Sequence, residues 1–359
     1  MPLYQYTPLD LNELSIRLVR VLPAANRNES IHCEVIHSTL SEGPILKYEA
    51  LSWAWGDLTI TKDIFIVDSS DTRSRRHRLP VTTNLYLALK EIREYQSISL
   101  LWIDAICIDQ TNTLERGHQV QRMLHVYRMA QKVKIWLGPK PWNSEYPLLQ
   151  TVQKLMEPCK SRPSLFTPRN RVPNSEPWLS NFTSYLYAAW FRRILVRRIL
   201  TLYQCIELTV LKIIQEVAAG RQFTLMCGKS TVSGKSFIAV FDRILTQWPS
   251  RGVFHEVKPI IDLMRRSGGV AGANIIRQQS LFALVGKFYM KGATDTRDKI
   301  FALIGVSKDA TQLMHPDYSL SLEQAFQKLA NVTFSGNVRI ERYQCGITLA
   351  GEGFCFGSL

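Results

Sequence analysis

The sequence predicts an α/β protein built on a mainly parallel sheet with helices on both of its faces. Three observations carry this prediction. Short apolar strand patterns alternate with amphipathic helix patterns in the N-terminal part of the chain. Hydrophobic residues make up 46% of the 359 residues, which is enough to build a core. The sequence also lacks an uncharged apolar run long enough to cross a membrane, so we expect no membrane span.

The predicted strands are short and rich in apolar residues. Alternation of apolar and polar residues predicts the first two strands, and apolar runs bounded by turn-forming residues predict the later ones. The seven predicted strands cover residues 14–20, 31–37, 48–53, 59–67, 99–104, 133–137 and 223–227.

Two helices are predicted between these strands. The first begins at Pro80, because proline is favoured in the first turn of a helix. The second begins near Thr113 and joins the strands at 99–104 and 133–137. A strand–helix–strand unit of this kind runs its two strands parallel, and we expect them to be neighbours in the sheet.

We expect three parts along the chain. Residues 1–45 are expected to supply strands that lead into a domain covering residues 46–220. Within that domain, a Pro-rich surface loop is predicted at residues 139–178. Residues 221–359 have mostly helical patterns, and we expect a helical C-terminal region packed on the sheet. The Gly-rich tail shows no clear element, and one interpretation is that the C-terminus is truncated.

The chain is basic, with 44 Lys and Arg against 30 Asp and Glu and a formal net charge of +14. Such a balance favours anionic partners, among them nucleic acids. The charges are scattered, however, and the sequence contains no nucleic-acid-binding motif, so we predict no nucleic-acid partner. The arginine-rich run at residues 73–78 is interpreted as a solvated loop, and the alternative is a contact with phosphate or nucleic acid.

Seven cysteines are scattered along the chain without C-x-x-C spacing. This pattern disfavours a disulfide framework and a structural zinc site, so we predict no metal. Reduced thiols, together with an N-terminus that does not resemble a signal peptide, predict a cytoplasmic protein.

Candidate ligand-binding groups follow two of the predicted strands. Asp104 ends one buried strand, and Asp109 and Gln110 come soon after it. If the strand ending near Ser52 runs parallel beside it, Ser52 and Trp55 reach the same edge of the sheet, where α/β proteins bind ligands. These groups could recognise a nucleoside, or they could hydrogen-bond to one another and lock two loops together.

The aromatic residues near this edge, and the cysteine between them, also have two interpretations. Trp53, Trp55 and Trp102 could fill the core or offer a face for stacking a base. Cys107 lies between two isoleucines, and an apolar setting raises the pKa of a thiol. We therefore predict that Cys107 is buried and structural.

Three long motifs stand out in the sequence. They read YEALSWAWG, LWIDAICIDQ and DTRDKIFALIG. Together, in this order over residues 48–320, they resemble the heterokaryon incompatibility (HET) domain of filamentous fungi. The motif positions to which we assign a structural role are Tyr48, Leu51, Gly56, Trp102, Cys107, Glu115, Gln119, Trp136, Arg297 and Asp298.

The resemblance implies a function in fungal non-self recognition. HET proteins trigger programmed cell death, and this chain would act by self-association or by binding another incompatibility protein. The HET domain is distantly similar to Toll/interleukin receptor (TIR) domains, which implies a flavodoxin-like fold. That similarity also implies an alternative activity, the hydrolysis of NAD as a substrate.

One block of the family pattern is split in this sequence. Trp190 begins the block and Glu216 closes it, with an insertion at residues 195–212 between them. One hypothesis is an in-frame retained intron; the alternative is a genuine insertion, which would displace Glu216. By its similarity to NAD-cleaving TIR domains, Glu216 is the candidate catalytic residue. The alternative is structural, with Glu216 paired to an arginine such as Arg192 or Arg193.

The third motif predicts a contact of structural importance. Asp298 is expected in the first turn of an apolar helix, where the helix dipole favours an acid. Arg297 is expected to form a buried or half-buried ion pair that ties the C-terminal region to the HET module.

Overall fold

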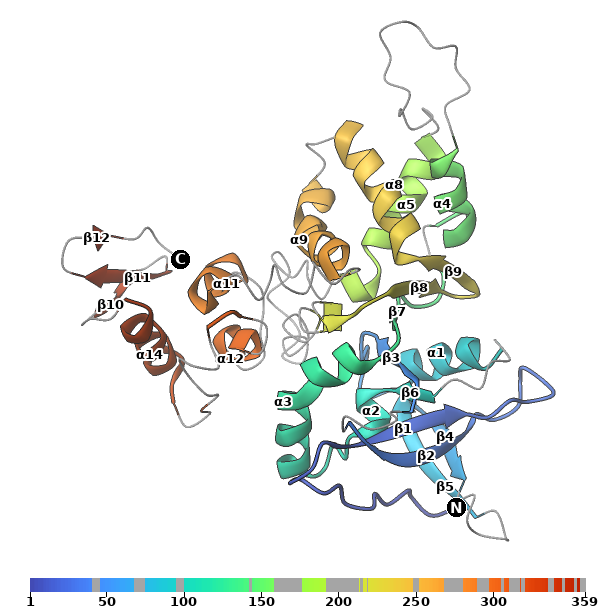
Figure 1. The fold of residues 1–359 in the computed structure, drawn as a ribbon. Coiled ribbons are helices and arrows are strands. Elements are labelled where there is room, and N and C mark those ends of the chain that lie inside the picture. The colour runs from blue at the N-terminus through green and yellow to red at the C-terminus, as the bar shows by residue number, and fades with distance from the viewer. Residues whose placement is uncertain are drawn as a thin grey trace, which may run out of the picture. The chain divides into compact units, whose positions relative to one another are not determined.

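The chain folds as two compact units in this computed structural model (Figure 1). The first unit comprises Met1–Arg192 and Gly220–Ile261, and the second comprises Arg193–Ala219 and Asp262–Leu359. The structure describes residues 1–40, 46–67, 75–94, 100–141, 144–157, 176–191, 213, 216–217, 219–247, 252–267, 280–288, 297–304, 307–309, 317, 320–334, 339–343, 346–351 and 354–355.

A nine-stranded sheet forms the centre of the first unit, in the order β5-β4-β2-β1-β6-β3-β7-β8-β9. Its strands are β1 (Ser15–Val21), β2 (His32–Thr39), β3 (Tyr48–Ser52), β4 (Thr61–Val67), β5 (Arg76–Thr82), β6 (Leu100–Trp102), β7 (Val133–Trp136), β8 (Phe223–Cys227) and β9 (Ser230–Ser233).

The sheet is mixed, so the expectation of a mainly parallel sheet is wrong. β6, β3, β7 and β8 are parallel neighbours, and β2 and β4 also pair in parallel. The pairs β1–β2, β1–β6, β4–β5 and β8–β9 are antiparallel. Three of these four pairs join strands that are consecutive in the chain, and a connection without a crossover helix returns the chain antiparallel.

The expected pairing of the strands at 99–104 and 133–137 is also wrong, although both strands run in the same direction. β3 lies between them, with Ala50 paired to Trp102 on one side and to Val133 on the other. All five residues of β3 are buried. A strand that is buried on both faces takes a central position in the sheet, which explains why β3 separates β6 from β7.

The first helix begins later than Pro80. Pro80 lies in β5, and α1 (Thr83–Glu94) begins after it. The residues of the arginine-rich run from Arg76 onward also belong to β5, where a solvated loop was expected, and residues 68–74 lie outside the described part of the chain. A proline is tolerated here because β5 is the outermost strand on this side of the sheet. The apolar stripe of α1 is confirmed, since Leu85 and Ala88 are fully buried.

The other helices assigned to the first unit pack around this sheet. They are α2 (Asp104–Cys107), α3 (Thr113–Met129), α4 (Leu148–Met156), α5 (Glu176–Leu186), α8 (Gly234–Gln247) and the greater part of α9 (Gly252–Ser267). The rings of Phe182, Phe237 and Phe254 connect α5, α8 and α9, with ring centroids 5.0 and 6.5 Å from that of Phe182. α3 begins at Thr113 as predicted, and Asn112 caps it.

The second unit contains helices and a small sheet. Its helices include α11 (Leu281–Phe288), α12 (Asp298–Ile304) and α14 (Leu322–Phe334). The tail forms an antiparallel three-stranded sheet from β10 (Arg339–Tyr343), β11 (Gly346–Gly351) and β12 (Phe354–Cys355). Residues 221–359 are therefore only partly helical, because β8 and β9 join the first unit and the tail forms strands.

Candidate functional site at the carboxyl edge of the parallel strands

The carboxyl ends of β6, β3, β7 and β8 meet at one edge of the sheet, because these four neighbours are parallel. This is the edge at which open α/β sheets bind ligands. The loops that follow the strands carry Trp53 to Gly56, Asp104 to Gln110, and Gly138. The structure therefore brings together the segments that the sequence assigned to a ligand site.

The carboxylate of Asp104 accepts three hydrogen bonds at this edge. Its side chain accepts hydrogen bonds from Trp53 Nε1 at 2.9 Å, from Trp55 Nε1 at 3.3 Å and from the backbone N–H of Ala105 at 2.9 Å. Asp104 is only 5% exposed. The two indole rings stack on each other with centroids 5.5 Å apart. The carboxylate thus fixes an aromatic pair that follows β3.

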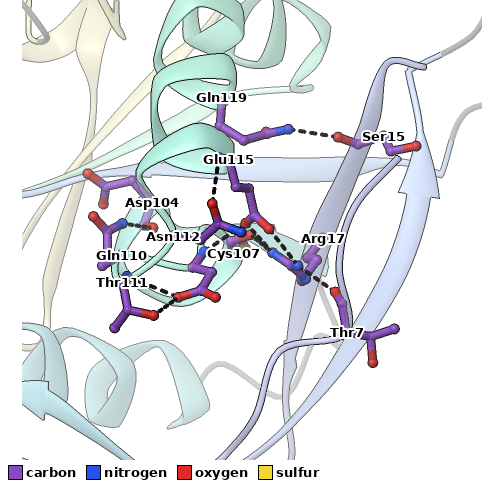
Figure 2. Close-up of polar contacts among 11 residues, drawn as sticks. Thr7, Ser15, Arg17, Asp104, Cys107, Gln110, Thr111, Asn112, Glu115 and Gln119 are labelled. Atoms are coloured by element: carbon purple, nitrogen blue, oxygen red, sulfur yellow. Dashed lines mark hydrogen bonds and ion pairs between the residues drawn. The ribbon is translucent and has the colours of Figure 1, made fainter. Parts of the chain in front are cut away.

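Asp109 and Gln110 bind to groups of their own loop, and Figure 2 labels Gln110 and Thr111 in that loop. The side chain of Asp109 accepts from the backbone N–H and the hydroxyl of Thr111, at 3.0 and 2.7 Å. Gln110 Nε2 donates to the backbone oxygen of Asp104 at 2.8 Å. Both side chains hold the turn between α2 and α3 in one conformation.

A buried ion pair anchors this loop to β1. Arg17 donates to both carboxylate oxygens of Glu115, at 2.6 and 3.0 Å, and the two side chains are 0% and 3% exposed. Arg17 also donates to the backbone oxygens of Cys107 and Thr7, at 3.0 and 2.6 Å (Figure 2). Glu115 accepts in turn from the backbone N–H of Asp109 at 2.8 Å. A bidentate guanidinium–carboxylate pair with these added hydrogen bonds fixes the position of α3 against β1.

Gln119 and Asn112 complete the attachment of α3. Gln119 Nε2 donates to the backbone oxygen of Ser15 at 2.9 Å. The side chain of Asn112 accepts from the backbone N–H of Glu115 at 3.1 Å, which satisfies one of the open donors at the start of the helix.

Ser52 and Trp136, at the ends of β3 and β7, also form hydrogen bonds with side chains of the protein. Ser52 Oγ accepts from Trp190 Nε1 at 2.7 Å, and both residues are fully buried. Asn84 of α1 accepts from Trp136 Nε1 at 2.9 Å and donates to the backbone oxygen of Ala54 at 2.6 Å. Gly56 follows with φ +71°, a conformation that favours glycine.

Several motif positions are core residues. Tyr48 donates its hydroxyl to the backbone oxygen of Val126, and Leu51 is fully buried. The buried Trp102 ring packs edge-on against Tyr127. Burial raises the pKa of the Cys107 thiol to about 12, so this cysteine is protonated and unreactive at neutral pH.

The remaining candidate residues belong to the second unit. Glu216 is 3% exposed. Arg297 is half-buried and donates to the backbone oxygen of Leu320 at 3.2 Å, and Asp298 is the first residue of α12. The apparent insertion at residues 195–212 lies outside the described residues.

Two residues that hold this site together, Arg17 and Asn84, were not predicted from the sequence. Arg17 could have been found, because a cation inside the apolar strand LSIRLVR requires a buried acid. Asn84 gave no signal, since a polar residue near the start of a helix ordinarily indicates a cap. Within the described ranges, the side chains form no cluster suited to a metal ion, and no helix is long and apolar enough to span a membrane.

Residues 48–196 match the family model described as "Heterokaryon incompatibility protein (HET)". The chain carries a HET domain. The ion pair between Arg17 and Glu115 joins this HET domain to a strand that precedes the matched region.

A curated relative supports the match beyond the HET domain itself. The chain is 26% identical to "Heterokaryon incompatibility protein 6, OR allele" of Neurospora crassa, over 95% of this chain and 55% of the relative. The chain therefore spans about half the length of that protein. No solved structure was found to be significantly similar to the chain.

Proposed function

We propose that this protein is an effector of heterokaryon incompatibility that acts in the fungal cytoplasm, where its self-association or its binding to another incompatibility protein triggers cell death. The observation that carries the proposal is the similarity to a heterokaryon incompatibility protein over 95% of the chain. The HET domain match at residues 48–196 supports the same function.

The geometry of the carboxyl edge favours a binding module over an enzyme. Asp104 already accepts three hydrogen bonds from Trp53, Trp55 and Ala105. Asp109 is engaged by Thr111 within its own turn. Side chains whose hydrogen bonds are directed at the protein itself hold loops in place, and a rigid set of loops presents a defined surface to a partner.

The test is inducible expression of the full chain in a Neurospora crassa strain that tolerates the empty vector. We expect growth arrest and cell death. We also expect a crosslinkable oligomer from the same cells that elutes earlier than the monomer in size-exclusion chromatography. Asp104→Ala should abolish killing, whereas the exposed Asp57→Asn should retain it. Full killing by an Asp104→Ala protein that stays monomeric would contradict the proposal.

A second candidate function is hydrolysis of NAD by Glu216. Its support is burial: Glu216 is 3% exposed, and a desolvated carboxylate can stabilise the positive charge that develops on ribose as nicotinamide leaves. Purified protein is incubated with NAD, and nicotinamide release is followed. If the protein releases nicotinamide and Glu216→Gln abolishes that release, the protein is an NAD hydrolase. If the protein kills cells without releasing nicotinamide, the binding function alone accounts for killing.

A further inference from the structure

The outer strands of the nine-stranded sheet have two different faces. α1 packs on β1, β4 and β5, and the buried residues of these outer strands include Ile64, Ile66 and Val81. Because side chains alternate along a strand, Phe65 and Val67 of β4 point to the opposite face. On β2 and β4 the residues of that opposite face are half-buried or exposed, and Arg76 and Arg78 of β5 are exposed, so this part of the face is open to solvent.

The strand register lines up particular side chains across this open face. Phe65 of β4 pairs with Arg78 of β5 on one side and with His32 of β2 on the other. In the next row, Arg76 of β5 pairs with Val67 of β4. Arg20 of β1 extends the face beyond β2, where it pairs with Glu34. Two ring side chains therefore lie side by side, with arginines on both flanks.

The rings at the centre of this face are arranged for contact with a flat ligand. The centroids of His32 and Phe65 are 5.5 Å apart, and their planes differ by 31°. Burial, followed by the nearby Arg76, lowers the pKa of His32, so its ring is neutral at pH 7. An imidazole and a phenyl ring thus lie next to each other on the face.

The cations of the face remain accessible. Arg76 is exposed, and the Arg78 side chain is 48% exposed although it lies 3.4 Å from Asp63. Arg20 is 36% exposed and pairs with Glu34 at 2.6 Å. The pair between Arg78 and Asp63 is exposed on both sides. Exposed ion pairs contribute little stability, so an incoming anion can replace Asp63 at low cost.

Open sheet faces that combine aromatic rings with arginines suit single-stranded nucleic acid, since bases stack on the rings while phosphates meet the cations. An acidic peptide would use the arginines but would gain nothing from the paired rings. The net charge of +14 adds long-range attraction for a polyanion. We propose that this face binds single-stranded nucleic acid, with a base stacked on Phe65 and His32 and phosphates held by Arg76 and Arg78.

This proposal departs from the expectation of no nucleic-acid partner, which rested on the lack of a motif in the sequence. The face is assembled from four strands, and its rows depend on the pairing of β2 with β4. It does not depend on the function proposed above, because it is tested by binding alone.

The binding test uses the full chain and a short fluorescein-labelled oligouridine, with fluorescence anisotropy measured over a range of salt concentrations. We expect Arg76→Ala with Arg78→Ala to weaken binding at least tenfold. Loss of two phosphate contacts should also make the slope of log K against log salt shallower by about 1.4. The matched control is Arg116→Ala with Lys235→Ala, which removes the same charge from exposed positions outside this face and should leave affinity nearly unchanged.

A second variant separates stacking from charge. Phe65→Leu keeps an apolar side chain but removes the ring, and we expect about tenfold weaker binding with an unchanged salt slope. Thermal melting confirms that each variant is folded. Three results would overturn the proposal: no binding of oligouridine by the unaltered chain, an equal loss in the control double variant, or unchanged affinity in Phe65→Leu.

Discussion

Two regions of the same sheet use their polar side chains in opposite ways. At the carboxyl edge of β6, β3, β7 and β8, Asp104, Ser52 and Trp136 bind to other groups of the protein. On the open face of β5, β4, β2 and β1, the arginines and rings remain accessible to solvent. The comparison indicates that the motif residues at the carboxyl edge hold the scaffold together. The side chains accessible to a ligand lie on strands whose sequences show no motif.

The largest expected effect comes from the buried ion pair. Glu115→Ala leaves Arg17 as an uncompensated buried charge and also removes the acceptor of the Asp109 N–H. We expect a loss of about 3–5 kcal/mol in the free energy of unfolding, measured by urea denaturation.

The matched control for this prediction lies on the open face. Asp63→Ala removes the partner of Arg78; the side chains of Arg78 and Asp63 are 48% and 37% exposed, and we expect a loss of less than about 1 kcal/mol. Equal losses of unfolding free energy in the two variants would contradict the view that the buried ion pair contributes more to stability than the pair on the open face.

The next effect concerns Asp104. Asp104→Ala leaves the indole N–H groups of Trp53 and Trp55 without their acceptor. Hydrogen bonds to a charged group contribute more than neutral ones, so we expect a loss of about 2–3 kcal/mol. A change in tryptophan fluorescence of the folded protein should accompany it, because the indole pair would lose its fixed geometry. An unchanged emission spectrum would argue against this arrangement.

The buried thiols predict a dependence on alkaline pH. Burial raises the pKa of Cys33 and of Cys107 to about 12, above the ordinary value of a thiol in the unfolded chain. The folded state therefore holds these protons more tightly, so the contribution to stability is complete below pH 9 and is lost as pH rises from about 9 to 12. Urea denaturation across this range checks the sign. Cys33→Ala with Cys107→Ala should make the loss smaller, and part of it should remain because burial also raises the pKa of Cys227 and of Tyr185 to about 12.

The smallest effect is expected at Asp109. Its carboxylate binds only the turn residue Thr111 among the contacts described for it, and that turn is exposed. Asp109→Asn keeps an oxygen acceptor in the same place, so we expect a change of about 0.5 kcal/mol or less. Killing in the fungal assay should also be unchanged. Loss of killing in a stable Asp109→Asn protein would restore the carboxyl edge as a ligand site.

Much of the scaffold could be predicted from the sequence. The strand patterns located β1, β2, β3, β4, β6, β7 and β8 to within a few residues, and the start of α3 was predicted at Thr113. These successes share a cause, because apolar periodicity depends on residues close together in the chain.

The errors fall where neighbours come from distant parts of the chain. Nothing local to β6 or β7 indicates that β3 lies between them, since that order follows from burying β3 on both faces. Pro80 fits the first turn of a helix as well as an outer strand, and only the pairing of β5 with β4 decides between the two.

By itself, the sequence determined the class of the fold, the family resemblance and the segments that reach the carboxyl edge. The tertiary structure decided what those segments do. Whether Asp104 faces a ligand or an indole depends on the loop that follows β3, and whether Phe65 stands beside His32 depends on the register of β4 against β2. The sequence gives the chemical type of each side chain. Its partners depend on long-range packing, which maximises burial over the whole unit.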